Sequence, residues 1–164
     1  MPELAVWHEF LVMVGGAAAA LTGLVFVAMS IHLREISSIP IHRARARATL
    51  IALVCIVLLC GLGLFPQSMR DFGLKLIVFG ILLTVMATAL SISSMRLPGG
   101  WDAARRLRVV IYIGTPLIVT IEGALMISGV DWAMAAFAAT LLLVIVNAVS
   151  NAWALMLEVS KENA

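Results

Sequence analysis

The sequence predicts an all-α polytopic membrane protein, a bundle of five transmembrane helices forming a single domain over residues 1–164. Hydrophobic residues make up 63% of the chain and charged residues only 12%, and the mean hydropathy is +1.11, values far from those of soluble domains. Five apolar runs have about the 20 residues that an α-helix needs to cross a bilayer. Nearly all charged residues fall outside these runs, which cover 10–33, 48–69, 76–95, 109–128 and 132–157.

The first run, 10–33, follows an acidic start, whereas a cleaved signal peptide begins with a positive region and has a shorter apolar stretch. We therefore expect this run to remain in the mature protein. Gly15, Ala19 and Gly23 recur every four residues and share one helix face. Small residues at this spacing allow close helix packing in membranes. The partner helix can belong to this chain or to a second copy.

The second run, 48–69, contains both cysteines, Cys55 and Cys60. Five residues of helix separate them by about 140° around the axis, so they cannot share one metal ion. We interpret them as small apolar core residues. The third run, 76–95, carries a polar stripe of Thr84, Thr88 and Ser91.

The fourth run, 109–128, contains a proline and a carboxylate. Pro116 removes a backbone donor, so a kink or local opening is expected there. Glu122 is the only formal charge inside any of the five runs. A carboxylate in a membrane segment faces a partner, a cavity or the bundle interior. Two interpretations stay open: a buried structural group, protonated or paired with Lys75, or a member of an ion pathway.

The fifth run, 132–157, carries a second polar stripe. Asn147 and Asn151 are one turn apart, with Thr140 seven residues earlier and Glu158 seven residues after Asn151. Counting from the outer ends puts Asn147 and Asn151 at about the depths of Thr88 and Ser91. The two stripes predict either interhelical hydrogen bonds or a polar lining for ions or solutes.

Basic residues predict the orientation, because Lys and Arg in short connectors stay on the cytoplasmic side. This pattern puts the N-terminus outside and the C-terminus in the cytoplasm. Trp7, Trp101, Trp132 and Trp153 lie at or near segment ends, as expected for interfacial anchors. The basic residues expected inside are Arg34, Arg43, Arg45, Arg47, Arg96, Arg105, Arg106, Arg108 and Lys161, against Arg70 and Lys75 outside.

The same charges indicate the partners of the chain. Its net charge of +2 is explained by topology and attraction to lipid, so no nucleic-acid partner is expected. Arg43, Arg45 and Arg47 are expected to bind anionic headgroups at the cytoplasmic face of the bilayer.

Three segments of the sequence have a recognisable pattern: the stretch from Trp7 to Ser30, with its Gly15-Gly16-Ala17-Ala18 core, Phe65-Pro66-Gln67 and Asn151-Ala152-Trp153. Together they resemble a family of small bacterial integral membrane proteins with no assigned activity. It implies a multi-pass protein of the bacterial cytoplasmic membrane and a multi-helix bundle. It implies no catalytic or binding residues.

The motif content disfavours an enzyme, because the chain lacks the nucleophile, metalloprotease and phosphate-loop motifs. His8, His32 and His42 are too scattered for a metal site, and no cofactor is expected. An odd number of segments does not fit the paired repeats of secondary transporters. The sequence predicts a homo-oligomeric channel for ions or small solutes, since five helices are few for a pore within one chain. The alternative is a noncatalytic accessory or packing subunit of a larger membrane complex.

Overall fold

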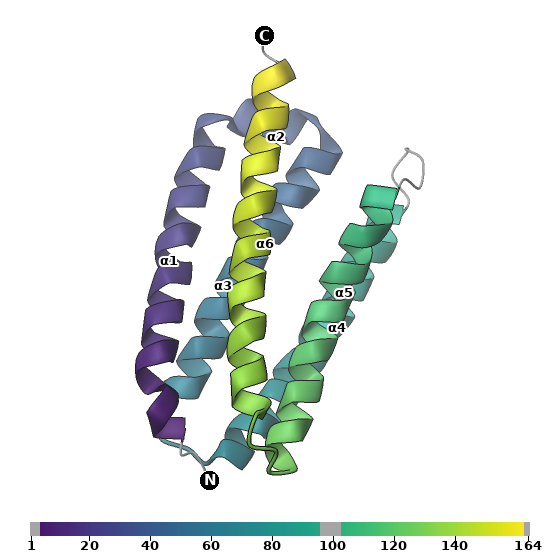
Figure 1. Cartoon of the computed structure of the whole chain (residues 1–164). Helices are drawn as coiled ribbons and strands as arrows, with labels where there is room; N and C mark the ends of the chain where they lie inside the picture. Colours follow the sequence, from purple (N-terminus) through teal and green to yellow (C-terminus); the bar gives the residue numbers. More distant parts are fainter. Residues whose placement is uncertain (1–3, 96–102, 163–164) are drawn as a thin grey trace. The chain divides into compact units, whose positions relative to one another are not determined.

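The computed structural model describes residues 4–95 and 103–162, and these residues form only helices and short connections (Figure 1). Five of the helices are long and apolar enough to span a membrane, which confirms the predicted all-α class and the number of spans within the described residues. The elements are η1 (Leu4–Trp7), α1 (His8–Ile31), α2 (Leu33–Ser38), α3 (Pro40–Leu64), α4 (Met69–Met95), α5 (Ala103–Ile127) and α6 (Ala133–Glu162).

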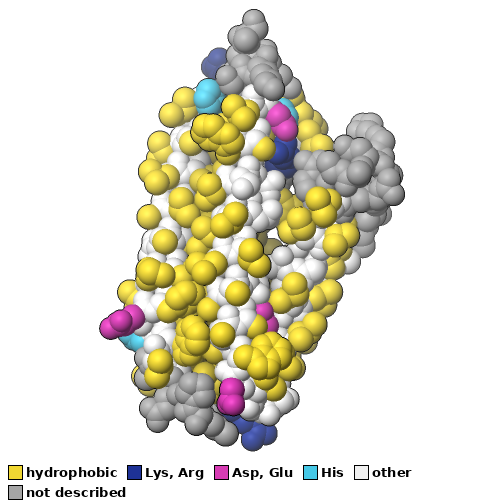
Figure 2. Space-filling view, in the orientation of Figure 1, with side chains coloured by type: hydrophobic (Ala, Val, Ile, Leu, Met, Phe, Trp, Pro, Cys, Tyr) yellow, Lys and Arg dark blue, Asp and Glu magenta, His cyan; other side chains and the backbone are white. Residues whose placement is uncertain are grey.

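The surface of these helices suits a hydrocarbon solvent. Large apolar side chains such as Phe26, Leu24 and Leu143 are exposed, and Figure 2 shows hydrophobic side chains over most of the visible helix surface. A soluble protein of this size would not expose so much contiguous apolar surface. The protein is therefore a multi-pass membrane protein whose outward side chains meet lipid.

Three helices, α3, α4 and α5, begin well before their predicted apolar runs, and local features explain the starts of the first two. α3 begins at Pro40, which occupies the first turn, where its missing N–H is not needed. α4 begins at Met69, after Ser68, whose hydroxyl accepts a hydrogen bond from the Asp71 N–H (3.1 Å) and donates one to Asp71 Oδ2 (2.7 Å). Hydropathy marks the part of a helix that lies in lipid, whereas caps set where the helix starts.

The described chain divides into two compact units, and the division falls inside α6. One unit comprises Met1–Ala5 and Pro66–Thr140, and the other comprises Val6–Phe65 and Leu141–Ala164. We call them the α4–α5 unit and the α1–α3 unit. The expected single domain stays a prediction.

In the α4–α5 unit, two antiparallel helices approach through glycines. A Cβ built on Gly73 of α4 would lie 2.6 Å from the carbonyl oxygen of Gly123 on α5, and a Cβ on Gly123 would lie 2.6 Å from the Gly73 oxygen. Only glycine permits this contact. The early turns of α6 add Phe137, whose ring packs edge-on against Phe72 with centroids 5.7 Å apart.

The end of α5 is closed by a Schellman turn. Gly129 adopts a left-handed φ of 76°, its N–H donates to the Met126 oxygen, and the Val130 N–H donates to the Leu125 oxygen, both at 3.1 Å. This tight turn leads the chain into α6.

The middle of α5 contains Pro116, and the helix is continuous through it. In the same turn, Thr115 Oγ1 donates a hydrogen bond to the Ile111 carbonyl oxygen (2.8 Å).

In the α1–α3 unit, α1 and α3 run side by side and α2 lies in the connection at one end (Figure 1). Gly15 of α1 packs on α3, because a Cβ built there would lie 3.0 Å from Cys60 Cβ. Near the α2 end, helices α1, α2, α3 and α6 share an apolar cluster. Its buried members are Met29, Ile36, Ala46 and Leu155.

The small-residue face predicted on α1 is used in part within the described chain. Gly15 makes the contact above, whereas Ala19 and Gly23 are exposed and a Cβ on Gly23 would meet nothing within 4 Å. The buried side chains of α1 near this face are Leu11, Val14 and Ala18. Packing through Ala19 and Gly23 stays a prediction.

Candidate functional site

Glu122 lies in the α4–α5 unit, on a stretch of α5 that carries no other charged residue. The residue is only 4% exposed. It stands next to Gly123, so the close contact between α4 and α5 passes beside its backbone. Counting from the turn after Ile127 places it about 9 Å from that helix end. A carboxyl group here is removed from bulk water.

The partner of Glu122 comes from α6. Thr140 Oγ1 donates a hydrogen bond to Glu122 Oε1 at 2.6 Å, and within the described residues Glu122 Oε2 is buried and has no hydrogen-bond partner. Lys75, the cation expected as a possible partner, donates instead to Gln67 Oε1 at 2.5 Å. The structure therefore pairs Glu122 with a hydroxyl group and leaves one carboxyl oxygen unsatisfied.

The polar stripe on α4 is largely satisfied by its own helix. Thr84 donates to the Gly80 carbonyl oxygen and Thr88 to the Thr84 carbonyl oxygen, each at 2.7 Å. Ser91 is buried. Hydroxyl groups bonded to the preceding turn keep an acceptor lone pair for a further partner.

The polar stripe on α6 divides between the two units. Thr140 belongs to the α4–α5 unit, where it binds Glu122, whereas Asn147 and Asn151 belong to the α1–α3 unit. Asn151 Nδ2 donates to Asn147 Oδ1 at 3.4 Å, and both side chains are half-buried. That this pair meets the α4 stripe stays a prediction.

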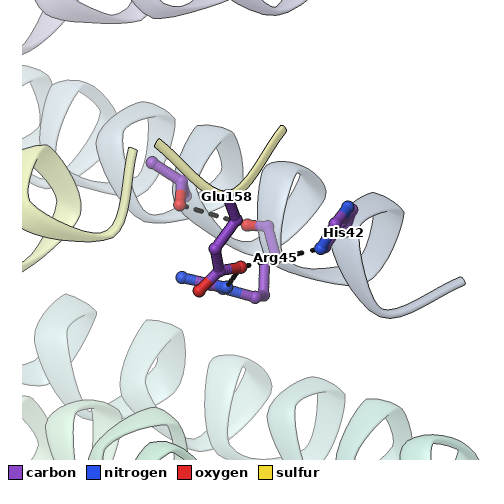
Figure 3. Close-up of polar contacts among 4 residues, drawn as sticks. His42, Arg45 and Glu158 are labelled. Atoms are coloured by element: carbon purple, nitrogen blue, oxygen red, sulfur yellow. Dashed lines mark hydrogen bonds and ion pairs between the residues drawn. The ribbon is translucent and has the colours of Figure 1, made fainter. Parts of the chain in front are cut away.

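A second polar site occupies the α2 end of the α1–α3 unit (Figure 3). Glu158 of α6 accepts a hydrogen bond from Arg45 Nη1, and its Oε2 lies 3.6 Å from His42 Nε2. The His42 and Arg45 side chains are 7% and 11% exposed, whereas the Glu158 side chain is 48% exposed. One carboxylate thus ties the end of α6 to the start of α3.

This contact separates the three arginines that were expected to bind lipid headgroups. The Arg45 side chain is largely buried and engages Glu158, whereas Arg43 and Arg47 are exposed on the same helix. Headgroup binding stays a prediction, carried by Arg43 and Arg47, which are one turn apart. Two residues named for the orientation lie outside the described residues: the basic residue Arg96 and the interfacial anchor Trp101.

The described residues contain no group of three or more His, Cys, Asp or Glu side chains that could hold a metal ion. Cys60 is buried against Gly15, and Cys55 is half-buried on the same helix. Both cysteines are free thiols.

Two features were missed from the sequence. The hydrogen bond between Thr140 and Glu122 joins residues that were assigned to separate segments, although counting outward from the turn at Gly129 puts them at similar depths. The glycine contact between α4 and α5 was also missed, because Gly73 and Gly80 are seven residues apart and do not form the four-residue spacing that marks small-residue faces.

Comparisons of the chain with protein-family models, with curated proteins and with solved structures gave no match. The function therefore has to be argued from the geometry of the chain itself.

Proposed function

We propose that this protein forms a channel for ions or small solutes as a homo-oligomer, and that Glu122 lies in the conducting path. The observation that carries the proposal is the buried Glu122 carboxyl, which has one oxygen on Thr140 and the other without a partner among the described residues. Burying a polar group without compensation is costly, so such groups in membrane segments mark functional positions.

Several copies are part of the proposal because five helices suited to span a membrane, the number found in the described residues, are few for a pore within one chain. Small subunits build a pore by closed symmetry about an axis. The exposed positions Ala19 and Gly23 on α1 suit a close contact with a helix of a second copy.

We further propose the bacterial cytoplasmic membrane, with the N-terminus outside and the C-terminus in the cytoplasm. The contact between Arg45 and Glu158 supports this orientation, because it joins the start of α3, next to the basic first connection, to the end of α6. These two parts of the chain would then lie on the same side of the membrane, the cytoplasmic side, where basic residues are retained. Protease removal of a C-terminal tag from right-side-out vesicles would contradict this orientation.

The direct test is flux through liposomes containing the purified protein. Glu122→Gln keeps the shape of the side chain and removes its charge, so we expect cation flux to change several-fold while the assembly elutes as before. Glu9→Gln is the matched control, because Glu9 is exposed at the start of α1 and should leave the flux unchanged. Equal flux in the wild type and Glu122→Gln would remove Glu122 from the path.

A further inference from the structure

We propose that Glu122 and Thr140 form a proton-binding site, at which the Glu122 carboxyl takes up and releases a proton as the transported ion. The inference rests on the proposed function and deepens it, because it names the ion that passes Glu122. It starts from the carboxyl oxygen Oε2, which is buried and without a hydrogen-bond partner in the described part of the chain.

The ligand set favours a proton over a metal cation. Glu122 supplies two oxygens and Thr140 one, and no group of three or more His, Cys, Asp or Glu side chains occurs among residues 4–95 and 103–162. Hard divalent cations take about six to eight oxygen ligands. A proton needs only one oxygen, and binding it makes the buried carboxyl neutral, which avoids the cost of an isolated charge in an apolar site.

The partner of Glu122 suits both protonation states. A threonine hydroxyl donates to a carboxylate and accepts from a carboxylic acid, so the 2.6 Å contact can persist when the proton leaves or returns. An arginine or lysine partner would instead hold the carboxyl in its charged form. Thr140 therefore permits the Glu122 carboxyl to release and rebind a proton.

The charged groups of α4 lie in its first two turns, close to the glycine contact, and two of them bond other groups. These residues are Arg70, Asp71 and Lys75; Asp71 bonds Ser68 and Lys75 bonds Gln67. The part of α6 in the α4–α5 unit, Ala133 to Thr140, carries no charged residue, and Asp131 precedes it and is exposed. The remaining charged residues of α5 stand at its opposite end and are Arg105, Arg106 and Arg108.

The test is labelling of the full-length protein in nanodiscs with dicyclohexylcarbodiimide, an apolar reagent selective for protonated carboxyls. The carboxyl proton moves to a carbodiimide nitrogen and the Glu122 oxygen bonds the central carbon. An oxygen-to-nitrogen acyl shift then gives a stable adduct, and nothing leaves. Peptide mass spectrometry should find one reagent mass on Glu122, falling as the pH is raised, and none on the exposed Glu9 and Glu158.

Two threonine variants make the labelling specific to the pair. In Thr140→Val the carboxylate loses its donor, so the pH at which labelling is half-maximal should rise by about one unit. Thr115→Val is the matched control on α5, because the Thr115 hydroxyl bonds its own helix at Ile111. Thr115→Val should keep the wild-type midpoint, and equal midpoints in all three proteins would overturn the role of Thr140.

Flux measured in parallel separates this inference from the proposed channel. Labelling at Glu122 together with proton flux that Glu122→Gln abolishes supports both. Potassium or sodium flux that depends on Glu122, without labelling, keeps the channel and overturns the proton site. Labelling without flux of any ion keeps the site as a proton-binding group and overturns its role in transport. If Glu122 is not labelled and no ion flux is found, both the proton site and the channel are overturned.

Discussion

Glu158 shows how one side chain can decide the role of a residue far away in sequence. Arg45 belongs to a run of arginines that is expected to set the topology and to bind headgroups. Its side chain is nevertheless largely buried and hydrogen-bonded to Glu158, while Arg43 and Arg47 are exposed. The two partners are 113 residues apart, and no local pattern reveals such a pairing. The charge of Arg45 was predictable, and its partner was not.

The contact between Arg45 and Glu158 predicts a measurable coupling. Replacing either partner, in Arg45→Gln or Glu158→Gln, should lower the thermal stability of the detergent-solubilised protein. A double-mutant cycle should give a coupling of about 1 kcal/mol, reduced by added salt because Glu158 is partly exposed. Arg43→Gln is the control, since Arg43 is exposed two residues before Arg45 and its replacement should leave stability unchanged. Additive effects of the two substitutions would contradict the contact.

At the scale of helices, the crossing of α4 and α5 depends on three glycine positions. Gly73 and Gly123 bring the two backbones together. About two turns further along α4, Gly80 faces Pro116 and Thr120, and a Cβ built on Gly80 would lie 3.0 Å from the Pro116 carbonyl oxygen. In lipid, helices associate through close packing and not through the hydrophobic effect. The glycines therefore position the helix that carries Glu122.

This crossing predicts opposite effects for glycine substitutions on one helix. Gly123→Ala should destabilise the protein by about 1–3 kcal/mol, because the methyl group would overlap the Gly73 oxygen, and Gly73→Ala should do the same. Gly114→Ala, also on α5, places its Cβ in open space and should be neutral or stabilising by up to about 1 kcal/mol from helix propensity. Thermal unfolding in detergent measures both. Equal melting temperatures for Gly114→Ala and Gly123→Ala would contradict the close approach.

For the whole molecule, the long-range pattern of hydropathy was sufficient to predict the class. Five spans were expected, and five helices suited to a membrane are present in the described chain. A run of about twenty apolar residues forms a spanning helix, because the helix satisfies its backbone hydrogen bonds within itself in the absence of water. Helix starts were predicted less well, since Pro40 and Ser68 set them outside the apolar runs. The pairing of Glu122 with Thr140 depends on how two helices turn about Gly129, which hydropathy does not encode.

The central claim at this scale is that several identical chains assemble into the conducting unit. Native mass spectrometry of the protein extracted in lipid nanodiscs tests it most directly, because it gives the copy number and the identity of every bound chain. The channel account predicts a closed assembly of identical chains with a fixed copy number. A monomer, or one copy bound to unrelated subunits, would contradict it and favour an accessory role.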